Sequence, residues 1–224
     1  MTAKLSRRSL LAALAAVPLG TLPSGLVRQA RAQGLITGTV CMAQPEAAAG
    51  PFYLDPGLVR RDITEDRVGA PMTLRLQVVQ ADCAPIEGAR VDVWQCDAEG
   101  VYSGVRSGLA DARGRSFLRG TQDTDAGGVV AFATIYPGWY PGRTPHIHYK
   151  VFLGGRTVLT GQLYFPDAVT AQVYASARPY RGRGAADTVN GADFLYRRAG
   201  AVAVADVSGT TAQLDAALVV GVRV

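Results

Sequence analysis

The histidines of this chain lie two residues apart, at His146 and His148, and its 224 residues contain no others. They fall within residues 145–151, whose isoleucine, tyrosine and valine favour a strand. Alternate side chains of a strand share one face, so the two imidazoles point the same way from backbones about 6–7 Å apart. The pair is therefore a candidate metal site, and two histidines on a solvated strand face are the other interpretation.

The segment just before the pair, residues 134–145, carries aromatic and basic side chains on a stiff backbone. Its prolines restrict the backbone, its glycines favour defined turns, and it holds Tyr136, Trp139, Tyr140 and Arg143. A metal ion needs more than two ligands. Aspartate or glutamate would complete a zinc or ferrous site, whereas tyrosinate suits a ferric ion, which lowers the phenol pKa from about 10. The alternative role for these aromatic residues is packing at one end of a sandwich.

Strands are the elements that must position these residues. Apolar runs bounded by turn residues predict strands at 72–78, 89–96, 129–136, 145–153, 156–165 and 214–224. A long polar loop spans 97–121, and helical periodicity is confined to short pieces such as 167–177. Because strands and helices do not alternate, we predict an all-β fold, an antiparallel β-sandwich with long active-site loops, over residues 71–224. Residues 33–70, broken by proline and glycine, are predicted to form an irregular N-terminal arm.

The first 32 residues have the three zones of an export signal. Lys4, Arg7 and Arg8 give a positive start, residues 10–17 are apolar, and small residues before Gln33 suit cleavage at that point. A membrane-spanning helix needs about 20 apolar residues, and proline and glycine interrupt this run too early. The arginine pair resembles the twin-arginine motif, whose route exports folded proteins with cofactors already bound. We therefore expect a cleaved leader, a periplasmic or secreted protein, and no stable membrane anchor.

The net charge of +5 does not indicate a nucleic-acid partner, because the excess lies in the leader. The leader holds five basic residues and no acidic one, which leaves 18 basic against 18 acidic residues in the remainder. With 48% hydrophobic and 18% charged residues, the chain does not have the composition of a disordered protein.

Three cysteines, Cys41, Cys83 and Cys96, suit one disulfide and one free thiol in an oxidising compartment. None of them has the spacing of a zinc knuckle. If 72–80 and 89–96 form a hairpin, Cys83 and Cys96 lie about 20 Å apart, too far to bond. A bridge is therefore expected to use Cys41, with its partner left open.

Four segments, in this order along the chain, resemble the intradiol ring-cleavage dioxygenases. They are residues 93–104, the Thr-Asp-Ala at 124–126, residues 134–148, and the Gly-Gln-Leu-Tyr-Phe at 161–165. The Gly-Pro-Phe-Tyr at 50–53, with Asp-Ile-Thr at 62–64, is similar to the arm of the exported, single-domain members related to protocatechuate 3,4-dioxygenase. The resemblance covers roughly residues 45–165, and the C-terminal third matches weakly.

The resemblance implies a non-haem Fe(III) site of two tyrosinates and two imidazoles. Its metal ligands would be Tyr102, Tyr140, His146 and His148. Arg143 would stabilise negative charge on the substrate, Gln162 would support the site without binding the metal, and Tyr140 would leave the metal when substrate binds. Gly142 stands where the better-known protocatechuate enzymes have a tryptophan, which changes the expected shape of the substrate pocket.

The implied reaction is cleavage of a catechol ring between its two hydroxylated carbons, with both atoms of O₂ entering a cis,cis-muconate product. Iron(III) would activate the substrate, and Arg143 would stabilise the developing charge. The expected partners are a small aromatic catechol and O₂; the particular catechol and the oligomeric state stay open. Two other functions are a non-catalytic transthyretin-like β-sandwich binding module, with the tyrosines as packing residues, and a zinc or copper H-x-H protein that uses Asp97 or Asp125.

Other residues near these motifs are expected to have structural roles. Asp125 is predicted to lie in a turn and Trp94 in the core. Four arginines flank Tyr102 and are expected on a solvated loop rather than beside the substrate: Arg106, Arg113, Arg115 and Arg119.

Overall fold

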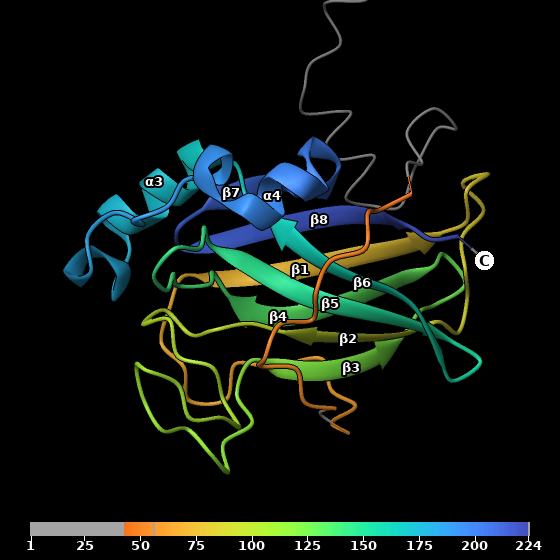
Figure 1. Cartoon of the computed structure of the whole chain (residues 1–224), viewed down its shortest axis with the longest axis horizontal. Coiled ribbons are helices and arrows are strands. Elements are labelled where there is room, and N and C mark those ends of the chain that lie inside the picture. Colours follow the sequence, from red (N-terminus) through yellow and green to blue (C-terminus); the bar gives the residue numbers. More distant parts are fainter. Residues whose placement is uncertain (1–42, 56, 224) are drawn as a thin grey trace, which may run out of the picture.

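The computed structural model describes residues 43–55 and 57–223, so the predicted export signal and Cys41 lie outside the described residues. Two four-stranded sheets make up most of this part (Figure 1). The strands are β1 (Pro71–Val79), β2 (Arg90–Trp94), β3 (Arg119–Asp123), β4 (Val129–Ile135), β5 (His146–Leu153), β6 (Arg156–Tyr164), β7 (Asp206–Thr210) and β8 (Gln213–Gly221). The helices are α3 (Asp167–Ser176) and α4 (Phe194–Ala199), with short 3₁₀ turns η1 (Tyr180–Gly182), η2 (Asn190–Ala192) and η3 (Ala201–Ala203).

The two sheets have the orders β4-β1-β8-β7 and β3-β2-β5-β6. Neighbouring strands are antiparallel except β1 and β8, which run parallel with Met72 opposite Leu214. The prediction of an all-β sandwich is confirmed. The parallel pair could not be predicted, because an alternating strand buries the same face whether its neighbour runs parallel or antiparallel to it.

Two short strands differ from the sequence-based expectation. β3 begins inside the segment that we predicted as loop 97–121, and β7 was not predicted at all. Both are edge strands with polar or glycine residues, and three of the five residues of β7 are exposed. β3 buries arginine, glycine and threonine rather than apolar residues, and β7 is mostly exposed, which is why hydrophobic alternation did not reveal them.

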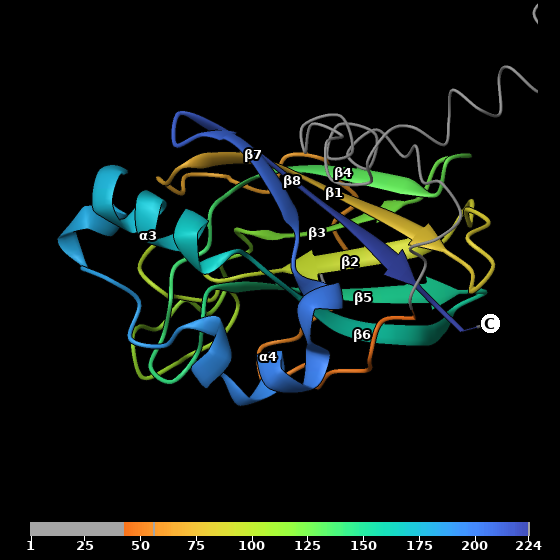
Figure 2. The same cartoon turned by 90° about the horizontal axis from the view of Figure 1, so that it is seen from above.

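The core lies between the two sheets and extends to α3 at one end of the sandwich (Figure 2). β1 contributes Met72, Leu74 and Leu76, all at most 2% exposed. Tyr136 follows β4, packs its ring against Phe165 and hydrogen-bonds through its hydroxyl to Thr170 of α3 (2.7 Å). Tyr136 therefore has the packing role that the sequence left open.

The described part of the N-terminal arm, residues 43–55 and 57–70, runs across both sheets with no strand longer than a single bridge. Val59 bridges to Thr121 of β3, and Asp62 bridges to Ala133 of β4. Nearer its start, Ala47 donates its backbone N–H to Thr160 of β6 (2.8 Å). These contacts hold the arm against β3, β4 and β6, and β6 pairs with the strand that carries the histidines.

Cys83 is disulfide-bonded, and Cys96 is a buried free thiol. The two therefore do not bond to each other, as expected, but the hairpin on which that expectation rested does not form, because β1 and β2 belong to different sheets. No helix in the described part of the chain has the length and apolar character needed to span a bilayer.

Candidate active site

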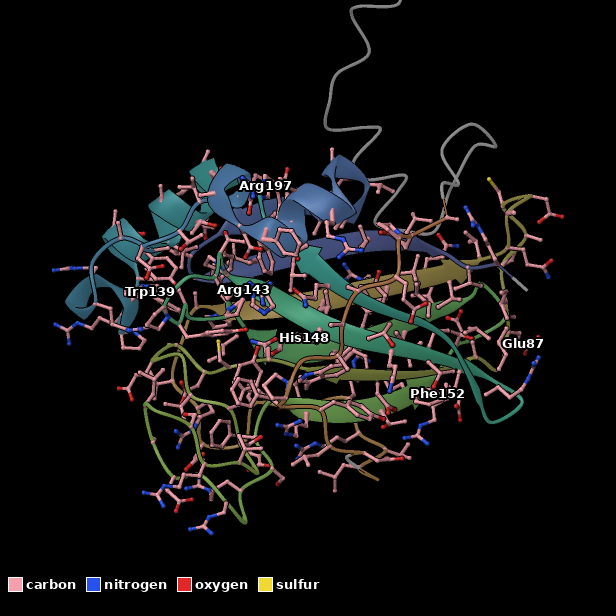
Figure 3. All side chains as sticks on the ribbon, viewed as in Figure 1. Glu87, Trp139, Arg143, His148, Phe152 and Arg197 are labelled. Atoms are coloured by element: carbon pink, nitrogen blue, oxygen red, sulfur yellow. The ribbon has the colours of Figure 1, made fainter. Side chains whose placement is uncertain are left out.

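The two histidines occupy the first and third positions of β5 and face the same side. His148 lies opposite Gln162 of β6 and Trp94 of β2, and both imidazoles are 2% exposed. Their Nε2 atoms are 3.1 Å apart. In Figure 3, Trp139 and Arg143 lie toward one end of the molecule, His148 lies nearer the middle, and Phe152 and Glu87 lie toward the other end. The pair is thus enclosed, and the interpretation of two solvated histidines is wrong.

The protonation of His146 is fixed by its backbone neighbour. Its Nδ1 lies 2.6 Å from the carbonyl oxygen of Thr144, so Nδ1 carries the proton and Nε2 presents a lone pair. Burial, followed by the charge of Arg143, lowers the pKa of His146 to about 3. Burial, followed by His146 and Arg143, also lowers the pKa of His148 well below its usual value. Both rings are therefore neutral, the state that metal binding requires.

Two phenols approach the histidine pair from different loops. Tyr140, on the loop between β4 and β5, has its hydroxyl 3.1 Å from Nε2 of His146. Tyr102, on the loop between β2 and β3, lies edge-on to Tyr140 and His148, with ring centroids 5.8 Å and 6.1 Å away. The Tyr102 hydroxyl is buried and makes no hydrogen bond with any described residue. The structure thus brings together all four residues that the resemblance named as ligands.

Both phenols have raised pKa values, so they would ionise only beside a strongly charged cation. Burial raises the pKa of Tyr102 well above its usual value. Burial also raises the pKa of Tyr140 to about 12, with the charge of Arg143 acting in the opposite direction. Two phenols with high pKa values and two neutral imidazoles fit a hard, strongly charged metal ion, because such an ion can hold the phenols as phenolates. The buried hydroxyl of Tyr102, which has no other partner, supports the same fit.

The carboxylates considered for a zinc or copper site are occupied elsewhere. Asp97 accepts hydrogen bonds from the backbone of Glu99 and Val101 and pairs with Arg67. Asp125 accepts from the backbone of its own turn, which confirms its predicted turn role. Among the residues that the structure describes, no three His, Cys, Asp or Glu side chains gather into a metal-binding group.

Two glycines let the loops of Tyr102 and Tyr140 cross backbone to backbone. A Cβ on Gly138 would lie 2.4 Å from the carbonyl oxygen of Asp97, so no larger residue fits without a shift. Gly100 has a φ of +86°, and a Cβ there would lie 2.3 Å from the carbonyl oxygen of Trp139. We refer to these two contacts, Gly100 against Trp139 and Gly138 against Asp97, as the glycine crossing. It fixes the bases of both loops and so sets the approach of the two phenols.

Arg143 borders the site and uses all three guanidinium nitrogens. Nη1 donates to the Tyr140 hydroxyl (3.3 Å) and Nη2 donates to Oε1 of Gln162 (2.5 Å). Nε donates to Asp193 (2.7 Å), a buried carboxylate that the sequence did not single out. Gln162 also accepts from the Tyr164 hydroxyl (2.9 Å), and its amide nitrogen donates to the backbone of the arm. Gln162 thus supports Arg143, and none of these hydrogen bonds reaches Tyr102 or Tyr140.

Aromatic rings surround the remaining sides of the histidine pair. Trp94 is buried, as predicted, and its indole stacks on His148. Phe52 of the arm stacks on Tyr102 with ring centroids 4.7 Å apart, and Tyr53 packs against Trp94 at 4.8 Å. The sequence indicated that Trp94 is a core residue, but its contact with a candidate ligand depends on strand register and was missed.

The four arginines near Tyr102 were expected to lie on a solvated loop; this is confirmed for three of them and is wrong for Arg119. Arg106, Arg113 and Arg115 are exposed. Arg119 is 3% exposed and donates to both the hydroxyl and the carbonyl of Ser103, because β3 carries it into the interior. Burial lowers the pKa of Arg119 to about 10. It packs behind the Tyr102 loop, away from solvent.

Comparisons with known proteins agree with this arrangement. A family model described as "Dioxygenase" matches residues 48–180. A hydroxyquinol 1,2-dioxygenase from Rhizobium sp. is 30% identical over 146 residues, which are 56% of this chain and 48% of that protein. The chain spans about half the length of the curated relatives it matches.

Two solved structures match over most of both chains. An intradiol ring-cleavage dioxygenase from Tetranychus urticae is 32% identical, with a TM-score of 0.75 over 82% of this chain and 95% of that one. The dioxygenase domain of a carbohydrate-binding fusion protein from Streptomyces sp. SirexAA-E is 29% identical, with a TM-score of 0.63 over 82% and 99%. With the family model matching more than half of its residues, this chain belongs to the intradiol ring-cleavage dioxygenase family.

Proposed function

We propose that this protein is an intradiol catechol dioxygenase that uses non-haem Fe(III) and O₂ to cleave the ring between its two hydroxylated carbons. One observation carries the proposal: Tyr102, Tyr140, His146 and His148 meet in one enclosed site. Packing tyrosines in a binding module would have no reason to place a buried hydroxyl without a partner beside two imidazoles. In the proposed enzyme, these four side chains hold the ferric ion.

When bound, Fe(III) supplies Lewis-acid withdrawal of electron density from the catecholate ring. The chain's own residues divide the remaining work. Tyr102 and the two histidines are buried and keep their positions, whereas Tyr140 is half-buried. A catechol that binds as a dianion releases two protons; the Tyr140 oxygen would accept one, and the other would pass to solvent. Arg143, with Nη1 3.3 Å from that oxygen, would steady both the Tyr140 phenol and the negative charge on the substrate.

We also propose that the protein is exported with its metal bound. The leader of residues 1–32, with its arginine pair at Arg7 and Arg8, supports this proposal. Cleavage before Gln33 would leave the arm and the β-sandwich as the mature protein. Mass spectrometry of the protein recovered from the periplasm or medium tests the cleavage site; a mature chain that retains Lys4 would contradict it.

O₂ uptake with a panel of catechols, combined with iron analysis of the same sample, tests the proposed reaction. The panel would contain unsubstituted, carboxylated, alkylated and chlorinated catechols, and mass spectrometry of products formed under ¹⁸O₂ would count the oxygen atoms incorporated. We expect stoichiometric iron, a red-brown colour from tyrosinate charge transfer, and a muconate product with two labelled atoms. A colourless, active preparation with stoichiometric zinc would refute the ferric proposal, and a ring opened beside the two hydroxylated carbons would refute the intradiol one.

A further inference from the structure

Residues 187–193 follow the residues matched by the family model and form hydrogen bonds with the loop that carries Arg143. Asp187 accepts a hydrogen bond from the backbone N–H of Gly142 (3.3 Å), and Asn190 accepts one from the Thr144 hydroxyl (3.0 Å). Asp193 accepts from both the Thr144 backbone N–H (3.1 Å) and Nε of Arg143 (2.7 Å). Three consecutive residues of the loop are therefore held by one short stretch of chain.

Asp193 differs from the other two because its side chain makes an ion pair with Arg143 and is 0% exposed. Its Oδ2 atom accepts from Arg143 and Thr144, while its Oδ1 atom accepts from the backbone N–H groups of Leu195 and Tyr196 at the start of α4. A buried carboxylate is costly unless hydrogen bonds satisfy it, and four donors do so here. The carboxylate is thus fixed in place and can serve as a rigid anchor.

Because Asp193 holds Nε of Arg143, it also sets the direction of the rest of the guanidinium. Guanidinium is planar, so the direction of Nε determines where Nη1 and Nη2 point. With Nε held by Asp193 and Nη2 by Gln162, Nη1 is left aimed at the Tyr140 hydroxyl. Without Asp193, the long arginine side chain would regain its rotamer freedom, and its charge would no longer be aimed at the reacting centre.

We propose that Asp193 is the positioning residue of the charge-stabilising Arg143, and that catalysis depends on it through Arg143 alone. This role rests on the proposed ring-cleavage function. No hydrogen bond joins Asp193 to the phenols or imidazoles proposed as ligands; its hydrogen bonds reach the site through Arg143 and Thr144, while its charge also acts on Tyr140 and His146.

A double-mutant cycle tests the proposal. The variants are Asp193→Asn, Arg143→Ala and the combination of both. We expect Asp193→Asn to lower kcat by about 10–100-fold with little change in KM, because a misplaced charge is felt in the transition state. In the Arg143→Ala background, the same change should lower kcat by less than about twofold. An equal loss in both backgrounds, or an unchanged kcat in the single variant, would overturn the proposal.

Two readouts separate positioning from general damage. Asp193→Asn should keep the iron content and the charge-transfer band of the wild type; their loss would mean that Asp193 acts through Thr144 and His146 instead. Asp167→Asn is the matched control, because Asp167 also holds this stretch, at the backbone of Asn190 (3.1 Å), but does not touch Arg143. It should keep wild-type kcat, and a loss equal to that of Asp193→Asn would attribute the effect to the whole segment.

Unfolding of the metal-free protein gives an independent arm. Asp193→Asn should lower the urea midpoint when Arg143 is present and should raise it or leave it unchanged in the Arg143→Ala background, where the carboxylate has lost its counter-charge. An equal decrease of the urea midpoint in both backgrounds would show that Asp193 does not act through its ion pair with Arg143. If the wild type cleaves no catechol, the proposed function fails and this role fails with it. A normal wild type beside an unaffected Asp193→Asn variant defeats this role alone.

Discussion

The indole of Trp94 lies parallel to the imidazole of His148, with ring centroids 4.9 Å apart and an interplanar angle of 10°. The two residues are cross-strand partners of β2 and β5. His148 Nδ1 is buried and has no hydrogen-bond partner among the described residues, whereas Nδ1 of His146 is held by Thr144. Stacking on Trp94 therefore orients His148, while a hydrogen bond orients His146.

Replacement of Trp94 should weaken metal binding without removing a ligand. Trp94→Leu removes the stacking surface, and we expect the affinity for iron to fall by about 10–100-fold, the usual effect of losing a group that orients a ligand. Trp94→Phe keeps a ring, and the indole N–H makes no hydrogen bond among the described residues, so this control should keep most of the affinity. Competition with a chelator measures both variants, and equal affinities would show that stacking does not orient His148.

Replacement of Tyr102 should separate metal binding from stability. In Tyr102→Phe we expect loss of iron and colour, because a ligand is removed. The metal-free variant should be as stable as the wild type or up to about 1 kcal/mol more stable, because its buried hydroxyl has no partner to lose. Iron analysis and urea unfolding of the metal-free protein give the two values. Full iron content in the variant would exclude Tyr102 as a ligand.

Removal of the guanidinium should slow the reaction and leave the metal in place. We expect Arg143→Ala to retain iron and to lower kcat by about 10²–10³-fold, the typical loss when one charge-stabilising donor is deleted. Arg106→Ala is the control, because Arg106 is an exposed arginine on the Tyr102 loop. Steady-state O₂ uptake compares the two variants. An unchanged kcat in Arg143→Ala would show that Arg143 does not stabilise charge in the reaction.

The metal-free protein should lose stability on acidification. Burial depresses the pKa of both histidines in the folded state, to about 3 for His146. In the unfolded chain the histidine pKa is near 6.5, so below that pH the unfolded chain binds more protons than the folded protein does. Stability is therefore present above about pH 6.5 and is lost as the pH falls toward 3, by up to about 1.4 kcal/mol per pH unit for each histidine. Urea unfolding between about pH 7 and pH 4 measures the slope, which should be smaller in His148→Gln. An equal slope in that variant would assign the acid sensitivity to other groups.

The sequence predicted the parts of this site that depend on local periodicity. Two histidines spaced by one residue in a strand must share a face, and β5 places them so. The strands with one buried face were found for the same reason. β3 and β7 lacked that pattern, and the parallel pairing of β1 with β8 left no trace in either strand.

The parts that depend on distant contacts were not accessible from local pattern. Tyr102 and Tyr140 were identified only through the resemblance, because no periodicity reports that two loops cross. Asp193 lies 50 residues from Arg143, inside the C-terminal third, where the resemblance is weak. Arg119 was misplaced because its charge predicts exposure, whereas the hydrogen bonds of its strand position allow burial.

The glycine crossing has a consequence for protein engineering. It anchors only the bases of the two loops, and Arg106, Gly108 and Leu109, at the tip of the Tyr102 loop, are exposed. Val105 packs against the buried cluster that contains Tyr102, so a combinatorial library or a loop graft confined to residues 106–111 should change this exposed tip while the phenols keep their spacing. Insertions at either glycine would instead push the two phenols apart, whatever sequence the graft carried.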